Sequence, residues 1–405
     1  MEQNSFKVYG YRWVVLLAFM LVVAVNQLLW ITFAPITSSA AGYYGVSDLS
    51  IGLLSMCFMI VYIFVSIPAS WVIDTYGIRV AVGIGVVLTG VFGLLRGLLA
   101  ANYTWVLVAQ IGIAIGQPFI LNAVTKVAAR WFPIRERATA AGLGSLAMYL
   151  GIVVGMVLTP YLTLQSSISS TLVAYGVVSV IAILVFFAVV RERPPTPPCP
   201  PEQEERSLVF DGLRQMFRQR DFVLLLIVFF VGLGVFNGVT TWIEEIVSPR
   251  GFSITQAGIV GGLMVGGGII GAVVIPTLSD HYRKRTPFII LSIVGATLGL
   301  VGLAIATGYW LLLVSAFVLG FFLLSAGPLG FQYGAEITYP APEGTSNGML
   351  LLMGQISGII FIVGMDMLKS SEGAMTSPLV VLVVLMVLGV VVCTRLKEPA
   401  ALGEA

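Results

Sequence analysis

Long apolar stretches recur along the whole chain and are separated by short polar segments. A helix needs about 20 mostly apolar residues to cross a bilayer. The pattern therefore predicts twelve membrane-spanning helices. We expect them at about residues 13–37, 48–74, 79–101, 104–128, 137–161, 169–190, 221–247, 254–280, 287–307, 309–333, 343–367 and 375–396. The first stretch is too long for a signal-peptide core and has no small-residue cleavage site, so we expect it to be the first span.

The lysines and arginines gather in alternate loops. If the N-terminus is cytoplasmic, the inner segments hold all of them except Arg250 and Lys369, in outer loops, and Arg96, inside the third span. Loops rich in lysine and arginine face the cytoplasm. The distribution predicts an integral protein of the plasma (cytoplasmic) membrane with both termini in the cytoplasm and the lipid bilayer as its surroundings.

The chain divides near its middle. Residues 191–206 are rich in proline and charge, which favours extended, solvated backbone, and residues 207–220 place apolar and basic side chains on opposite helical faces. This predicts a cytoplasmic linker over 191–220 that includes a short amphipathic helix at the membrane surface. We expect an all-α membrane protein with a six-helix bundle over 1–190 and a second over 221–405.

The composition narrows the function classes. Hydrophobic residues make up 58% of the chain and charged residues 10%, and the mean hydropathy is +1.01. A soluble domain has about 25% charged residues, so an ordinary soluble enzyme and a nucleic-acid-binding protein are excluded. The single histidine and three distant cysteines support neither a metal site nor a disulfide framework. We expect no cofactor and no enzyme, because the sequence holds no Ser/His/Asp set and no Walker-type loop.

A charged loop recurs in both halves of the chain. Between the second and third spans the sequence reads Asp74-Thr-Tyr-Gly77-Ile-Arg79, and residues 280–285 repeat the acidic and basic positions 206 residues later without the glycine. Gly77 permits a tight reversal, and a charged pair at the inner face can latch two bundles together. Internal repetition is typical of transporters. We expect Asp74, Gly77, Arg79 and Asp280 to form an inner gate.

With this loop, and with Arg130-Trp-Phe-Pro-Ile-Arg-Glu-Arg137 after the fourth span, the chain resembles the major facilitator superfamily over essentially its full length. The resemblance implies two six-helix bundles around a central cavity that move by alternating access.

Three blocks of the sequence carry a narrower resemblance. They are Tyr11-Arg-Trp-Val-Val-Leu-Leu with Asn26-Gln-Leu-Leu-Trp-Ile31, then Gln117-Pro-Phe-Ile-Leu121, and finally Glu336-Ile-Thr-Tyr-Pro340 with 343–348 and 355–361. These blocks resemble the family of the feline leukaemia virus subgroup C receptor (FLVCR), which includes choline and ethanolamine transporters and proposed haem exporters. The choline site of that family uses a tryptophan of the first helix and glutamines of the fourth and eleventh. The matching positions here are Trp30, Gln117 and Gln355.

The depth of the polar residues agrees with this resemblance. Gln117 and Gln355 lie at the middle of their spans, and Gln110 shares a helix face with Gln117. Burying a polar group in hydrocarbon costs free energy unless the group finds a hydrogen-bond partner or lines a cavity. For the glutamines and Asn237, both helix–helix hydrogen bonding and cavity lining remain possible interpretations. For the aromatic candidates, packing and the interfacial belt are the alternatives. The candidate binding residues are Trp30, Gln117, Gln355, Asn237, Tyr62, Tyr149, Phe236 and Trp242.

No aspartate, glutamate, lysine, arginine or histidine lies at the middle of a predicted span. Glu244 and Glu245, toward the outer end of the seventh span, are interpreted either as an outer vestibule that attracts cations or as solvated helix ends. Proton-coupled transporters usually need a buried acid or histidine, whereas aromatic rings and amides suit an organic cation. The membrane potential alone drives such a cation.

The sequence thus predicts a transporter that moves a choline-like or other small organic cation by alternating access and facilitated uniport, working as a monomer. One alternative is an exporter of haem or another hydrophobic compound or drug. The absence of an intramembrane histidine weakens the haem alternative. Another alternative is a non-transporting membrane receptor or sensor.

Overall fold

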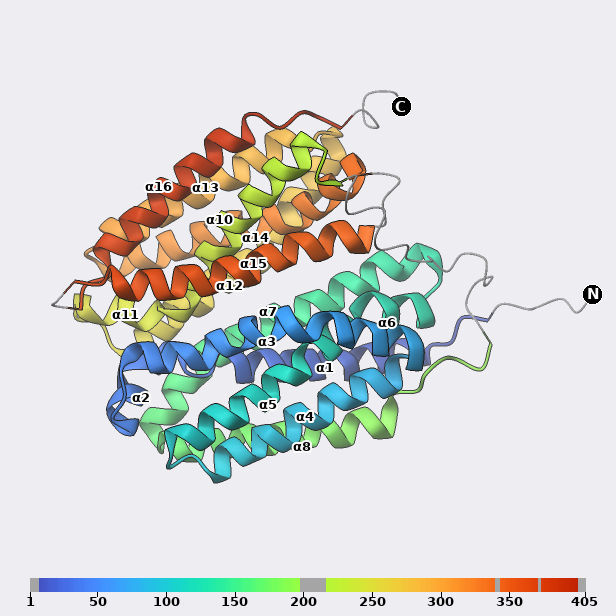
Figure 1. The fold of residues 1–405 in the computed structure, drawn as a ribbon, viewed down its shortest axis with the longest axis horizontal. Helices are drawn as coiled ribbons and strands as arrows, with labels where there is room; N and C mark the ends of the chain where they lie inside the picture. The colour runs from blue at the N-terminus through green and yellow to red at the C-terminus, as the bar shows by residue number, and fades with distance from the viewer. Residues whose placement is uncertain (1–6, 197–215, 339–342, 371–372, 400–405) are drawn as a thin grey trace, which may run out of the picture. The chain divides into compact units, whose positions relative to one another are not determined.

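The computed structural model describes residues 7–196, 216–338, 343–370 and 373–399, and its elements are helices (Figure 1). Twelve helical segments of the described chain are long and apolar enough to cross a membrane, which confirms the predicted fold class. The elements are α1 (Tyr11–Ile31), η1 (Ala34–Ile36), α2 (Thr37–Tyr44), α3 (Asp48–Tyr76), α4 (Ile78–Leu98), α5 (Tyr103–Leu121), α6 (Val124–Trp131), α7 (Ile134–Gln165), α8 (Ile168–Val189), α10 (Arg220–Thr241), α11 (Ile243–Val247), η3 (Ser248–Arg250), α12 (Ile254–Tyr282), α13 (Thr286–Ile305), α14 (Tyr309–Thr338), α15 (Glu343–Met367) and α16 (Thr376–Cys393).

The chain forms two compact units with the same internal packing. The first unit is Met1–Phe33 with Ser39–Glu205, and the second is Ala34–Ser38 with Arg206–Ala405. In the first, α1 contacts α5, α7 and α8, as α10 contacts α14, α15 and α16 in the second. Likewise α4 contacts α5 and α8, as α13 contacts α14 and α16. The two units are therefore structural repeats. The predicted amphipathic helix at 207–220 lies largely outside the described residues.

Glycines let the long helices approach one another closely within each unit. A Cβ atom at Gly151 of α7 would overlap the carbonyl of Ala24 in α1, and one at Gly271 of α12 would overlap the carbonyl of Phe321 in α14. Helices in a membrane associate through such close packing because lipid is as apolar as their side chains. The small residues therefore fix which helices pair.

Three of the predicted spans are interrupted, which the apolar pattern did not predict. α1 stops at Ile31 and continues as η1 and α2; α5 gives way to α6; and α10 gives way to α11 at Trp242. In the first case Pro35 contributes, because proline has no N–H group to donate and disfavours helical backbone at the residue before it. Each interruption leaves main-chain carbonyls that need partners other than their own helix.

Candidate functional site

Trp30 lies one residue before the end of α1 and is 6% exposed. Its indole N–H donates to the carbonyl of Ser55 in α3, at 3.1 Å. The hydrogen-bonding group of this tryptophan is thus already in use. What the side chain offers to a ligand is the face of its ring, which suits an organic cation.

Gln117 of α5 and Gln355 of α15 are the two predicted amides whose hydrogen-bonding groups are free. Gln117 is buried and Gln355 is half-buried, yet among the described residues neither side chain has a hydrogen-bond partner. The unbonded polar atoms of both amides are therefore not completely shielded from solvent. Each unit therefore contributes one accessible, unbonded amide from within a membrane-spanning helix.

Two other predicted residues use their polar groups to join helices. The Asn237 amide donates to the carbonyl of Gly354 at 3.1 Å, and the Trp242 indole donates to that of Ile362 at 3.0 Å. The first bond ties α10 to α15, and the second ties the residue between α10 and α11 to α15. The sequence left helix–helix hydrogen bonding and cavity lining open for Asn237, and its amide forms a helix–helix hydrogen bond in the structure. Phe236 is 7% exposed in α10, and Tyr149 is half-buried in α7.

Tyr62 belongs to a polar cluster that the sequence did not single out. Its hydroxyl donates to the side-chain oxygen of Asn122 at 2.7 Å, directly after α5 ends. The Asn122 amide in turn donates to the hydroxyls of Ser66 and Ser70, each at 3.0 Å. The cluster binds α3 to the interruption between α5 and α6. Its signal in the sequence was the pair of serines four residues apart, on one helix face.

Gln110 differs from Gln117 in that its amide is hydrogen-bonded. It is fully buried, and its oxygen accepts a hydrogen bond from Arg96 of α4 at 2.8 Å. Its amide donates to the carbonyl of Leu29 at 3.2 Å. Arg96 itself was a missed residue, although a charge inside an otherwise apolar span was visible in the sequence.

The two glutamates at the start of α11 are buried and bonded. Glu244 accepts hydrogen bonds from both the N–H group, at 2.6 Å, and the hydroxyl of Ser38. Glu245 forms an ion pair with Lys369. In the structure these carboxylates are held by neighbouring groups of the second unit rather than standing in water. Their role as a cation-attracting vestibule stays a prediction.

In the first unit, Asp74 of the predicted inner loop forms an ion pair with a residue of α6. Asp74 and Lys126 form an ion pair at 2.7 Å, and the exposed Arg79 side chain takes no part in it. The main-chain N–H groups of Ile78 and Arg79 donate to the carboxylate of Glu192, at 3.1 and 2.7 Å. Glu192 therefore caps α4, where the helix dipole favours a negative charge.

The second unit repeats the glutamate cap but not the ion pair of the first. Glu398 accepts from the N–H groups of Arg285 and Thr286 at the start of α13. The Arg285 side chain pairs with Asp280 and with Glu336, the latter at 3.1 Å. Burial lowers the pKa of Arg285, but its hydrogen bonds to Asp280 and Glu336 outweigh burial and leave its pKa raised. The capping glutamates were missed in the sequence, although they too lie 206 residues apart.

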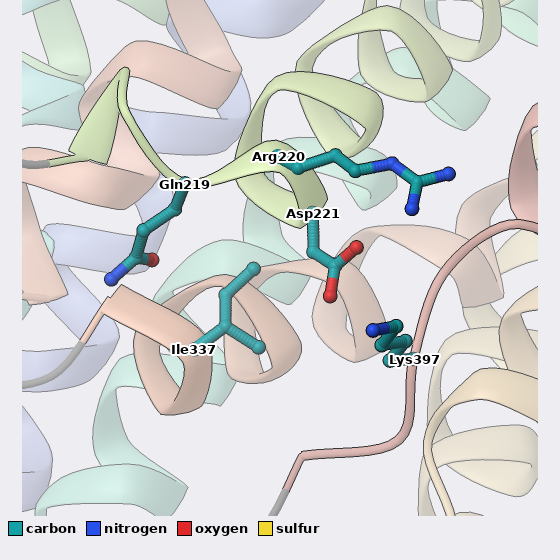
Figure 2. Close-up of a pocket in the computed structure, with 5 residues that line it drawn as sticks. All are labelled: Gln219, Arg220, Asp221, Ile337 and Lys397. Atoms are coloured by element: carbon teal, nitrogen blue, oxygen red, sulfur yellow. The ribbon is translucent and has the colours of Figure 1, made fainter.

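A cavity of about 290 Å³ lies where α10 begins in the second unit (Figure 2). Figure 2 shows the side chains of Asp221 and Lys397 extending into the same space. None of the predicted binding residues lines it. Its lining residues are Gln219, Arg220, Asp221, Ile337 and Lys397. Within the described chain, no cluster of three or more histidine, cysteine, aspartate or glutamate side chains could hold a metal ion.

Comparisons with known proteins agree with these features. The profile of the Major Facilitator Superfamily matches residues 15–362. The choline/ethanolamine transporter FLVCR1 of Felis catus is 31% identical over 411 residues, which cover 96% of this chain and 73% of that protein. The chain belongs to the FLVCR family of the major facilitator superfamily. This FLVCR-family protein is therefore an integral membrane transporter, and the families it matches are not families of enzymes.

One further relative and one solved structure are also similar to this chain. Solute carrier family 49 member A3 of Xenopus tropicalis is 31% identical over 380 residues, covering 89% of this chain and 79% of that protein. A bacterial homologue of the human lysosomal transporter Spinster, solved in an inward-facing and unoccupied conformation, matches with a TM-score of 0.73 and 17% identity. That match covers 98% of this chain and 97% of the other, and it supports the fold alone.

Proposed function

We propose that this FLVCR-family transporter moves a choline-like or other small organic cation by alternating access and facilitated uniport. The observation that carries the proposal is the pair of unbonded amides, Gln117 and Gln355, one in each unit. Trp30 adds an aromatic ring whose N–H group is already bonded. Rings and neutral amides stabilise an organic cation without requiring a titratable group. The relatives named as choline/ethanolamine transporters support the same substrate class.

The positions of the buried charges support uniport. Of the ionisable side chains buried in the spans, Arg96 is two residues from the end of α4 and keeps its charge. Glu244 and Glu245 start α11 and are bonded. The membrane potential supplies about 2.3 kcal/mol per charge per 100 mV. At about 1.4 kcal/mol per tenfold, it would accumulate a monovalent cation roughly fiftyfold.

The proposed setting is the plasma (cytoplasmic) membrane with both termini in the cytoplasm and a single chain as the working unit. The lysine and arginine distribution supports this orientation. Export of haem has no comparable support. The single histidine, His281, lies exposed in the last turn of α12.

The test is uptake of labelled choline, ethanolamine and a neutral metabolite into proteoliposomes. We expect choline to accumulate when an inside-negative potassium diffusion potential is applied and to be unaffected by an imposed pH gradient. A thermal-shift panel that adds betaine and haem identifies ligands independently of transport. Uptake that follows the pH gradient and ignores the potential would refute uniport. A response to haem or a neutral compound with none to any cation would refute the substrate class.

A further inference from the structure

Arg96 is a fully buried arginine near the end of α4. Among the described residues no carboxylate bonds its guanidinium, and its Nε–H group has no hydrogen-bond partner. A guanidinium keeps its charge in proteins, and a buried charge without an opposite partner is costly. Such a residue inside a membrane span points to a functional role.

The partners of Arg96 belong to the end of α1. Its Nη1 group donates to the carbonyl of Leu29 at 2.9 Å, and its Nη2 group donates to the hydroxyl of Thr32 at 3.3 Å. Because α1 ends at Ile31, the Leu29 carbonyl is one of the last four that lack a partner within the helix. The partial negative charge of a helix C-terminus also favours a cation there. The α1 end thus supplies what a carboxylate would otherwise provide.

Two further contacts close this network. Gln110 accepts from Arg96 at 2.8 Å and donates to the same Leu29 carbonyl at 3.2 Å. The ring of Phe33 lies 5.6 Å from the guanidinium carbon, within the range of a cation–π contact. We call Arg96, Gln110, Leu29 of α1 and the two residues Thr32 and Phe33 that follow α1 the α1 clasp.

The clasp is adjacent in the chain to the candidate binding residue Trp30 and to the segment 34–38. Trp30 falls between the clasped residues Leu29 and Thr32, and its indole is fixed separately to Ser55. Directly after Phe33, the short segment 34–38 packs with the second unit, and the chain returns to the first unit at Ser39. In that segment Ser38 is bonded to Glu244. The clasp therefore holds the end of α1 and the last two residues of the first unit before this segment.

We propose that Arg96 is a positioning residue of the transport cycle. It fixes the end of α1 within the first unit, so that Trp30 keeps its place although the short segment 34–38 packs with the second unit. The effect on substrate rests on the proposed function, whereas the fixing of the α1 end does not. An arginine suits this task because its planar fork holds several acceptors at once, which a lysine ammonium cannot do in the same geometry.

The test compares Arg96→Lys with Arg250→Lys, a matched control. Arg250 also donates to carbonyls at a helix end, those of Leu303 at 2.7 Å and Ala306 at 2.9 Å after α13, but in the second unit. Gln110→Met, which removes a neutral member of the clasp, is the second variant. The three readouts are thermal stability, hydrogen exchange of the segment 26–38, and the dissociation constant for choline against the maximal transport rate.

We expect exchange of 26–38 to become about tenfold faster or more in Arg96→Lys and Gln110→Met and to stay unchanged in Arg250→Lys, since each clasp variant loses a hydrogen bond. We also expect choline binding to weaken about tenfold in the clasp variants, with a smaller change in maximal rate. Folded clasp variants with wild-type exchange in 26–38 would overturn the proposal. So would equal effects of Arg250→Lys. If wild-type protein binds no cation but the exchange effect appears, the cation proposal fails and the positioning role stands.

Discussion

Arg283 occupies in the second unit the position that Gly77 occupies in the first. The two residues lie 206 positions apart, each ends the helix that precedes the charged inner loop, and each has a positive φ angle, 87° for Gly77 and 51° for Arg283. Among the described residues Arg283 is the one non-glycine residue with positive φ. A positive φ angle is thus kept in both repeats, although the ψ angles differ (179° at Gly77 and 41° at Arg283) and only one repeat has the glycine that favours it.

This relationship predicts opposite effects for two substitutions. Gly77→Ala should destabilise the protein by about 1–3 kcal/mol, because its backbone conformation is disfavoured for other residues. A Cβ atom there would also overlap the carboxylate of Glu192. Arg283→Gly should raise stability by up to about 1 kcal/mol by removing the left-handed strain. Thermal unfolding in detergent measures both. A loss of stability in Arg283→Gly would mean that the contacts of the arginine outweigh its backbone strain.

The capping glutamates predict a second, paired effect. Glu192→Ala should expose the first N–H groups of α4 and cost about 1–2 kcal/mol, and Glu398→Ala should do the same for α13. Since the two caps lie in different units, their effects should add to within about 0.5 kcal/mol in the double variant. Thermal unfolding of the four proteins checks this. A clear departure from additivity would instead support the predicted inner gate, in which the two loops are coupled.

The amides predict a separation of binding from stability. Gln117→Leu and Gln355→Leu should each weaken choline binding about tenfold while leaving the unfolding temperature nearly unchanged, because neither amide is bonded within the described chain. Asn237→Leu is the matched control. It removes the bond to Gly354 and should mainly reduce stability. Isothermal titration and thermal unfolding of the same samples separate the two effects. Unchanged binding in both glutamine variants would remove these residues from the site.

Much of the fold was predictable because a membrane imposes a simple rule. Apolar stretches of sufficient length gave the twelve spans, and the recurring Asp74 and Asp280 loops revealed the repeat. The interruptions at Ile31 and Trp242 were not predictable from hydropathy. The average apolarity of a segment says nothing about which carbonyls find partners on other helices, and it is these partners that allow a helix to stop inside the membrane.

The sequence nominated candidate site residues, but it could not show which of their polar groups are already hydrogen-bonded. Gln117 and Gln110 share a helix face and looked equivalent in the sequence. The structure separates them, because Arg96 reaches Gln110 from α4 and engages its oxygen, whereas nothing in the described chain engages Gln117. Which of two similar amides is free depends on the side chains of neighbouring helices, and a single sequence does not reveal those neighbours.

The ion pair between Glu245 and Lys369 in the second unit allows a test of the predicted outer vestibule. Glu245 and Lys369 have side-chain exposures of 9% and 14%, so removing one partner leaves a buried charge. Lys369→Met should therefore cost about 3–5 kcal/mol, and adding Glu245→Leu should recover most of that loss. Thermal unfolding measures the cycle, and choline uptake at low and high salt measures the vestibule role. If Glu245 serves only structure, the double variant should transport choline with unchanged affinity at both salt concentrations. If Glu245 attracts cations, the affinity of the double variant should fall at low salt and approach that of the wild type as salt screens the charge.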